Sequence, residues 1–269
     1  MQWLNGRREE LRSDFSARAL HITLGMIPRR LGKADLALGD SDIAAADEAR
    51  HDWDPTDWSV ADAARILVLV ETAGAGSQAF ADRFSDLCRT ADVGESVAFY
   101  RGLPLYPDPD SIEDQAGEGL RTNMRAVFEA VAHRNPFPRE QFNTARWNQM
   151  VLKALFVGSN LHPIQGLDER ANAELAHVLC DYAHERWSAG RPVSPELWRC
   201  VGPHATDDMV VDLARTLADG TDIECKAAAI ALSVNPSEAA KSVLESAGDL
   251  AQSITRGEFT WDTLVSELN

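Results

Sequence analysis

The fold class of this chain is decided by residues 59–70, which read SVADAARILVLV. The run from Ile66 to Val70 is the one compact apolar stretch that would suit a buried strand. Ser59, however, is followed three residues later by Asp62, in an approximation to the capping box that begins an α-helix. The residues flanking the run therefore favour helix. Because helical signals also recur in almost every other part of the sequence, we expect an all-α fold.

Further segments set the expected helix boundaries in the first half of the chain. After two glycines near residue 75, a helix is expected from about Ala79 to Thr90. Ser111 is expected to cap a long helix that runs to about His133, where the segment Asn-Pro-Phe-Pro at 135–138 ends it. Its apolar positions follow the spacing of a buried stripe and are Leu120, Met124, Val127, Phe128 and Val131. The acidic, turn-rich residues 35–57 are expected to form a surface loop with one short helix.

The tail, from about Ala205, contains short helical segments rich in Ala and Leu. They cover residues 209–215, 224–232 and 238–244, with turns at Gly220 and Asn235-Pro236. The small residues from Ala227 to Leu232 let helices approach closely. Such a succession suggests HEAT-like stacking in an α-solenoid. We expect a helical domain over residues 1–204 that carries the site, and a HEAT-like tail over residues 205–269 that is packed on it or continuous with it.

Charge and cysteine content exclude several classes of protein. The chain carries 42 Asp and Glu against 26 Lys and Arg, a net charge of −16, whereas a general nucleic-acid binder needs a basic face. We find no apolar signal-peptide core, and no run approaches the roughly 20 apolar residues of a membrane span. The four cysteines are scattered, which favours buried, reduced thiols over disulfides or a thiolate zinc site. We expect a cytoplasmic protein without a cofactor.

Residues 134–199 differ from the rest of the chain in charge. They contain eight Lys and Arg against seven Asp and Glu, a balance of +1, so the remaining residues carry −17. Three of the seven tryptophans lie in this stretch, and five of the seven histidines lie between His133 and His204. Cationic, aromatic and imidazole side chains gathered in an acidic chain indicate a binding site, without naming a reaction.

One helix in this stretch is expected to begin at Asp168, which is a good N-cap residue. Arg186 would lie at the centre of its apolar face, and Asn172 would lie on the same face. An arginine there is either a structural ion-pair partner or a clamp for a ligand anion, because an unpaired buried charge is costly. We expect Arg186 to be substantially buried and hydrogen-bonded to a carboxylate or backbone carbonyl of another helix.

The opposite face of that helix carries a stripe of imidazole and carboxylate side chains. The stripe is a solvated face, a set of hydrogen bonds to another helix, or a site for a divalent metal. The spacing differs from the His-Glu-x-x-His metal motif, and we expect no tightly bound zinc or iron. The residues of the stripe are Glu174, His177, Asp181 and His184.

The helix expected from Trp147 to Phe156 is apolar at nearly every angle, which is typical of a helix buried on all sides. Asn148, Gln149 and Lys153 are embedded in it. Buried amides must be hydrogen-bonded. Lys153 either extends its ammonium group to solvent, or has a lowered pKa and serves as a base, an anion binder or a Schiff-base former.

We expect four polar side chains to converge on one pocket: Asn148, Lys153, Asn172 and Arg186. Each lies in an apolar helical sector, where a lone polar group would be penalised and a shared pocket would satisfy several at once. The two cations would favour a phosphate or carboxylate ligand. The candidate site also includes two tryptophans that could line the pocket, Trp147 and Trp187, and two histidines, His162 and His184.

Several runs of residues resemble the EboA family, and the resemblance covers most of the chain. It is strongest between residues 100 and 204. The runs are PRRLGK at 28–33, YRGLP at 100–104, RNPFP at 134–138, WNQMVLKA at 147–154, GLDERAN at 166–172, DYAHERW at 181–187 and PELWR at 195–199.

The resemblance implies a place among the products of bacterial ebo gene clusters. These clusters encode proteins similar to TatD metal-dependent hydrolases, UbiA prenyltransferases, sugar-phosphate cyclases and sugar isomerases, which implies a secondary-metabolite pathway that joins or moves an isoprenoid and a cyclitol-like unit. We therefore expect a non-catalytic binding or accessory protein for a small anionic or prenylated metabolite, or for other ebo-cluster proteins. One alternative is an enzyme acting on a phosphorylated or prenylated intermediate, with Lys153, Arg186 and His184 or His162 as acid/base and anion-binding groups. The other is a scaffold for the pathway enzymes.

Overall fold

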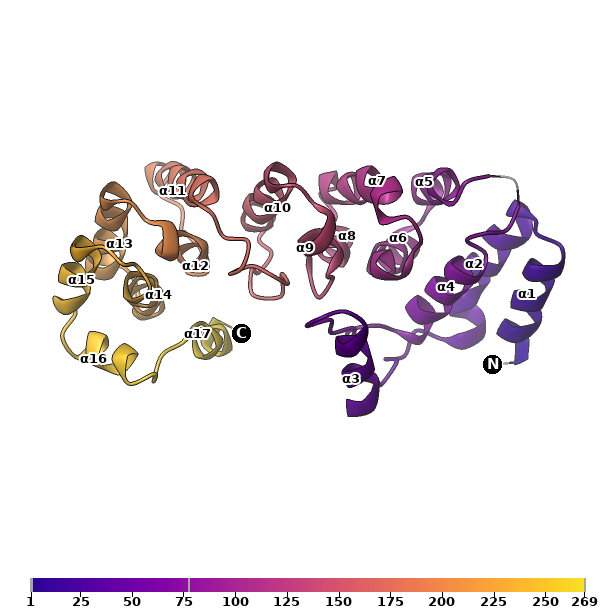
Figure 1. Cartoon of the computed structure of the whole chain (residues 1–269), viewed down its shortest axis with the longest axis horizontal. Helices are drawn as coiled ribbons and strands as arrows, with labels where there is room; N and C mark the ends of the chain where they lie inside the picture. Colours follow the sequence, from indigo (N-terminus) through magenta and orange to yellow (C-terminus); the bar gives the residue numbers. More distant parts are fainter. Residues whose placement is uncertain (1, 77, 269) are drawn as a thin grey trace. The chain divides into compact units, whose positions relative to one another are not determined.

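The computed structural model describes residues 2–76 and 78–268, and within them every named secondary-structure element is a helix (Figure 1). The all-α prediction is therefore confirmed. The nearest feature to a sheet among these residues is one isolated bridge between Asp35 and Ser59.

The chain forms two compact units. The first comprises Met1–Trp147 with Pro163–Gln165, and the second comprises Asn148–His162 with Gly166–Asn269. The boundary between them runs through helix α10 (Thr144–Phe156), after Trp147. The expected division at residue 204 stays a prediction.

The first unit contains nine complete α-helices and one short 3-10 helix among its described residues. They are α1 (Gln2–Ser13), α2 (Ala17–Leu31), α3 (Asp40–Ala49), α4 (Val60–Glu71), α5 (Phe80–Thr90), α6 (Val93–Arg101), η1 (Leu103–Leu105), α7 (Pro109–Arg121), α8 (Arg125–Ala132) and α9 (Phe137–Gln141).

Helix α4 is the central element of the first unit, and it is the segment that decided the fold class. Its capping box forms as expected, because Ser59 Oγ accepts from the backbone N–H of Asp62 at 3.1 Å and Asp62 Oδ2 accepts from the backbone N–H of Ser59 at 3.0 Å. Helices α1, α2 and α6 pack around it, and Ile66, Val68 and Leu69 of its apolar run are buried, whereas Val70 is 36% exposed. The buried Arg65 donates to the carbonyl oxygens of Leu24 and Gly94, which ties α4 to α2 and α6.

The expected long helix from Ser111 to His133 is wrong. Two helices, α7 and α8, replace it, and the break lies at residues 122–124. Thr122 has an extended backbone, and its hydroxyl accepts from the backbone N–H of Met124 at 3.0 Å. This local bond competes with the helical ladder, so the helix ends there. The helix at residues 80–90, the turn after residue 132 and the one short helix in the acidic loop are confirmed.

The second unit contains the rest of α10 and seven further α-helices among its described residues. They are α11 (Ala173–Ser188), α12 (Leu197–Val201), α13 (Asp207–Asp219), α14 (Asp222–Ser233), α15 (Glu238–Glu245), α16 (Asp249–Thr255) and α17 (Trp261–Leu268), with the 3-10 helix η2 (Gly202–His204).

Helix α14 is the core of this unit, since α12, α13, α15, α16, α17 and η2 all pack on it. The alanines of its run from Ala227 to Leu232 are fully buried. Gly202 lies so close to α14 that an added Cβ would stand 2.6 Å from the carbonyl oxygen of Ala231. Small residues therefore do permit close helix contact here, as the sequence predicted.

No helix within the described part of the chain is both long enough and apolar enough to cross a membrane.

Candidate functional site

A groove in the second unit is the strongest candidate for a functional site. Its volume is about 530 Å³, within the range typical of small-molecule pockets. One wall comes from α10 and the other from α11 and the turn that follows it. The lining residues are Gln149, Leu152, Lys153, Phe156, Tyr182, Glu185, Arg186 and Arg191.

The groove exists because one side of α10 is not covered by other helices. Met150, Val151 and Ala154 are buried as expected, but Lys153 is only half-buried and Phe156 is 73% exposed. The prediction that α10 is buried on all sides is therefore wrong. Helices α10 and α11 are not closely packed against each other, so the large side chains between them line an open groove instead of filling a core.

Arg186 is positioned by the turn after α11. Its Nε donates to the carbonyl oxygen of Pro192 at 3.0 Å, and its guanidinium lies 6.0 Å from the centre of the Tyr182 ring. The expected carbonyl partner is present, but it belongs to the turn that follows the same helix. Gly190, with φ of 65°, reverses the chain and brings Pro192 back toward Arg186. The predictions of substantial burial and of a partner on another helix are wrong, since Arg186 is half-buried.

Lys153 differs from Arg186 in having no polar partner. Among the described residues its ammonium group makes no ion pair and no hydrogen bond, and partial burial lowers its pKa. Arg191, which is exposed, and Arg186 likewise form no ion pair with any carboxylate that the structure describes. Glu185 is the acidic residue lining the groove. The groove therefore presents three cations and one carboxylate beside a largely apolar wall. This arrangement suits a ligand that has both an anionic group and an apolar part.

Asn148 and Asn172 lie outside this groove. Their side-chain amides bind each other, with Nδ2 of Asn172 donating to Oδ1 of Asn148 at 2.9 Å and a reciprocal bond at 3.3 Å. Asn172 also accepts from the backbone N–H of Leu175, which makes it the N-cap of α11. The expected N-cap at Asp168 is wrong, because that carboxylate pairs with Arg199 through two bonds of 2.6 Å. The four polar residues expected in one pocket therefore occupy two places.

His162 is tied into the loop after α10. The buried carboxylate of Glu196 accepts from the backbone N–H groups of Leu161 and His162, and it lies 3.1 Å from Nδ1 of His162. These bonds fix the loop, and His162 does not line the groove.

His184 and Trp187 lie on a different side of α11 from the groove-lining residues. Nε2 of His184 is 2.8 Å from both carboxylate oxygens of Asp212 on α13. Trp187 lies between Trp198, at 5.9 Å between ring centres, and the guanidinium of Arg215, at 4.3 Å from its ring centre.

Trp147 is fully buried in the first unit. Neither expected tryptophan wall, Trp147 or Trp187, borders the groove; its aromatic residues are Phe156 and Tyr182.

The expected stripe on α11 does not bring its members together. His177 and Asp181 are exposed and 3.8 Å apart, while His184 pairs with α13. The prediction that no zinc or iron binds tightly remains a prediction.

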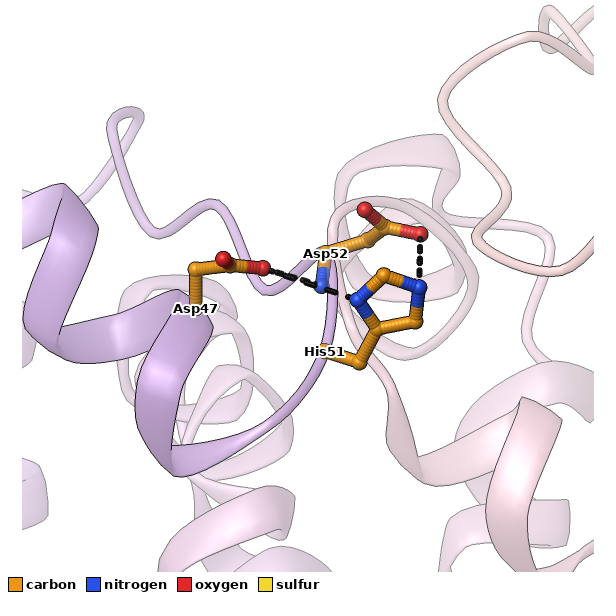
Figure 2. A group of neighbouring side chains, drawn as sticks. All are labelled: Asp47, His51 and Asp52. Carbon is orange, nitrogen blue, oxygen red and sulfur yellow. Dashed lines mark hydrogen bonds and ion pairs between the residues drawn. The ribbon is translucent and has the colours of Figure 1, made fainter.

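One group of potential metal ligands does appear elsewhere, at the end of α3 (Figure 2). His51 Nε2 lies 3.4 Å from Asp52 Oδ2, and His51 Nδ1 lies 3.8 Å from Asp47 Oδ1. All three residues are exposed. Asp47 also accepts from the backbone N–H of Asp52 at 2.7 Å, which supports the positive φ of 60° at Asp52. These contacts explain the group as part of the turn that ends the helix.

Sequence reasoning missed Arg191, Phe156 and Tyr182 as members of the site. Phe156 lies in the helix that was expected to be buried on all sides. Arg191 could have been identified from the net charge of +1 over residues 134–199, because it is one of the basic residues that produce this charge.

Comparison with protein-family models identifies the family of this chain. The model of a family described as "Metabolite traffic protein EboA" matches residues 1–202, which include every residue that lines the groove. No curated protein and no solved structure matches the chain. Since the matched region is well over half of its length, the chain belongs to the EboA family.

Proposed function

We propose that this protein is a non-catalytic carrier that binds an anionic, partly apolar small metabolite in the groove between α10 and α11. The groove is large enough for a small molecule and remains open at one side. A carrier needs this combination, because its ligand must enter and leave.

The observation that carries the proposal is the gathering of Lys153, Arg186 and Arg191 without an acidic partner. The chain has 42 carboxylate side chains, and most of its basic residues within the described ranges form ion pairs. Cations left free in a concave site offer charge-assisted hydrogen bonds to a ligand carboxylate or phosphate.

Apolar side chains of α10 suggest that part of the ligand is apolar. Leu152 and Phe156 stand one turn apart on α10, and Phe156 keeps 73% of its surface exposed. Burying an exposed aromatic side chain against a hydrocarbon is favourable by about 25 cal/mol per Å² of apolar surface. A ligand with a hydrocarbon chain of moderate length would cover both side chains while its anion lies near Arg186.

The family description, a metabolite traffic protein, supports a more specific version of this role. We propose that the ligand is a phosphorylated or prenylated intermediate of a bacterial secondary-metabolite pathway, and that the carrier exchanges it in the cytoplasm with other ebo-cluster proteins. In this proposal the helices after residue 204 stack as a HEAT-like array and support the walls of the groove. They would then form a tail distinct from residues 1–204.

Titration calorimetry with decyl phosphate, below its micelle-forming concentration, tests the proposal, with decanol as the uncharged control. We expect decyl phosphate to bind more tightly than decanol. The double variant Arg186→Gln, Arg191→Gln should raise the Kd for decyl phosphate at least about tenfold, because a hydrogen bond to a charged group contributes about 1.5–3 kcal/mol. Phe156→Ser should weaken the binding of both ligands.

Two residues of α13 provide matched controls within the same unit. Arg215 is an exposed arginine and Val211 is 66% exposed, yet neither lines the groove. Arg215→Gln and Val211→Ser should therefore leave both affinities unchanged. Equal affinity for decanol and decyl phosphate, or equal effects of the α13 and groove variants, would contradict the proposal.

A further inference from the structure

The chain has only four lysines among its 26 basic residues, and their surroundings differ sharply. Lys226 pairs with Asp222 at 2.9 Å and with Glu267 at 2.8 Å, and these hydrogen bonds raise its pKa. Lys241 pairs with Glu238 at 2.6 Å. The amines of Lys226 and Lys241 are therefore held as ammonium ions by carboxylates.

The two remaining lysines lack such partners but differ in exposure. Lys33 is exposed and lies outside any pocket described here. Lys153 is half-buried in the groove beside Leu152 and Phe156. Lys153 is thus the lysine that lies in a concave site against an apolar wall and forms no ion pair with a carboxylate that the structure describes.

This setting changes what the amine can do. A lysine acts as a nucleophile only when it has lost its proton, and an ammonium ion stabilised by a carboxylate loses it rarely at neutral pH. Burial against apolar side chains has the opposite effect, and desolvation lowers the pKa of Lys153. At neutral pH a larger fraction of Lys153 than of an ordinary lysine carries a free electron pair.

We propose that Lys153 binds carbonyl compounds covalently and reversibly, as an imine between its Nζ and an aldehyde or ketone held in the groove. The proposal rests on the carrier function of the same groove and names the reactive group of its ligand. Arg186 and Arg191 line the same groove and would hold an anionic group on the ligand while its carbonyl carbon meets the amine.

The reaction balances without an oxidant, a reductant or a metal. The electron pair of Lys153 Nζ forms a bond to the carbonyl carbon, the carbonyl π electrons move to oxygen, and a proton passes from the nitrogen to that oxygen. The resulting carbinolamine loses its hydroxyl group as water while the nitrogen loses a proton and the C=N bond forms. Water reverses each step and releases the unchanged carbonyl compound, as a carrier requires.

Reductive trapping tests the inference on the full chain. The protein is incubated at pH 7 with 4-formylbenzoate, an aldehyde that carries a carboxylate, and the imine is reduced with cyanoborohydride. Peptide mass spectrometry then separates the four lysines from the α-amino group. We expect Lys153 to be labelled several times faster than Lys33, and Lys226 and Lys241 to be labelled least. The advantage over Lys33 should shrink as the pH approaches the ordinary lysine pKa of about 10.4.

Variants and a second, uncharged probe distinguish labelling that depends on the groove from the general reactivity of lysine amines. Arg186→Gln should slow the labelling of Lys153 by 4-formylbenzoate but not by uncharged benzaldehyde, whereas Arg215→Gln should change neither. In concentrated urea, Lys153 and Lys33 should react alike. Lys153→Met should remove the label at this position and leave that on Lys33 unchanged.

Failure of this inference can be distinguished from failure of the carrier proposal, because decyl phosphate has no carbonyl group. If decyl phosphate binds but 4-formylbenzoate labels the four lysines evenly, the imine is refuted and the carrier stands. If Lys153 is labelled selectively while decyl phosphate does not bind, the imine stands and the anionic carrier is refuted.

Discussion

The basic residue that joins α4 to α6 in the first unit and those that line the groove of the second unit are used differently. In the first unit, Arg101 pairs with Asp62 at 2.8 Å and also with Asp57, so that α6 is tied to the start of α4. In the groove of the second unit, Arg186 and Lys153 line a cavity and form no ion pair among the residues that the structure describes. Cations of the first kind join helices, whereas those of the second kind are left available to a ligand.

This difference has a physical meaning in so acidic a chain. A protein selected for stability alone gains by pairing its cations with carboxylates. Unpaired cations in a concave site are a departure from that rule, and such departures are expected where function requires them. The comparison therefore predicts that removing a paired cation damages folding, and that removing a groove cation damages binding.

The largest expected effect is that of Arg101→Met. Asp62 is buried and would keep only its bonds to Ser59, so the first unit should lose about 2–3 kcal/mol, less than a fully buried pair because Arg101 is partly exposed. Hydrogen exchange in peptides of α4 and α6 measures this loss. Arg186→Met should cost the second unit no more than about 1 kcal/mol, since it gives up one hydrogen bond to a carbonyl, at a half-exposed side chain where water can replace it. Equal losses from the two substitutions would remove the distinction between paired and free cations.

A smaller effect is expected at the pair of amide side chains, Asn148 and Asn172, which do not line the groove. Asn172→Ala removes the N-cap of α11 and the bond to Asn148, and it should cost about 1–2 kcal/mol. Hydrogen exchange in peptides of α11 and α12 measures the loss in this unit. Affinity for decyl phosphate should remain unchanged under native conditions. A large loss of affinity in a folded Asn172→Ala protein would show that the amide pair belongs to the binding site after all.

Acid should act on the first unit through Glu71. Its hydrogen bond with Arg8, together with the nearby Arg12, lowers the pKa of this carboxyl group. A folded state with a lowered carboxyl pKa binds fewer protons than the unfolded state, so its stability is present above the ordinary Glu pKa of about 4.3 and is lost as the pH falls through the lower folded value. Glu71→Gln should therefore flatten the pH dependence of hydrogen exchange in α1 and α4 below that pH. An unchanged slope would mean that the pair does not stabilise the unit.

The smallest effect is expected for Lys153→Met, and its sign is opposite to that of Arg101→Met. Burial lowers the pKa of Lys153, so the unfolded state binds more protons between the folded pKa and the ordinary one, and the stability of the native protein rises with pH in that window. Replacing the amine with an apolar side chain removes this penalty. Thermal unfolding at pH 7 should occur at the same or a slightly higher temperature. A clear decrease would indicate that Lys153 has a structural partner.

The parts of the fold that depend on neighbouring residues could be predicted from the sequence. Ser59 and Asp62 form their capping box within three residues, and α4 begins where that pattern places it. The break after α7 was missed because it depends on Thr122 bonding Met124 in competition with a regular helical pattern. Asp168 was predicted as an N-cap, but its carboxylate pairs with a distant residue, Arg199, and Asn172 caps α11 instead.

The candidate site was only half predictable for a related reason. The angle of a residue around a helix shows that Lys153 and Arg186 each lie on apolar sectors, and both do line one groove. The same argument placed Asn148 there, but Asn148 lies about 140° around the helix from Lys153 and pairs instead with Asn172. Sequence periodicity gives directions around one helix and not the distance to the next, so it could not show that one side of α10 stays open at Phe156.

Mass spectrometry of the small molecules that co-purify with the protein from its native host tests the central claim most directly. The wild-type chain and Arg215→Gln are predicted to retain the same compound or compounds, each with an acidic group and a hydrocarbon portion. The double variant Arg186→Gln, Arg191→Gln is predicted to have lost them while remaining folded. Compounds that are neutral, or that are retained equally by the double variant, would contradict the assignment of this groove as an anion-binding carrier site.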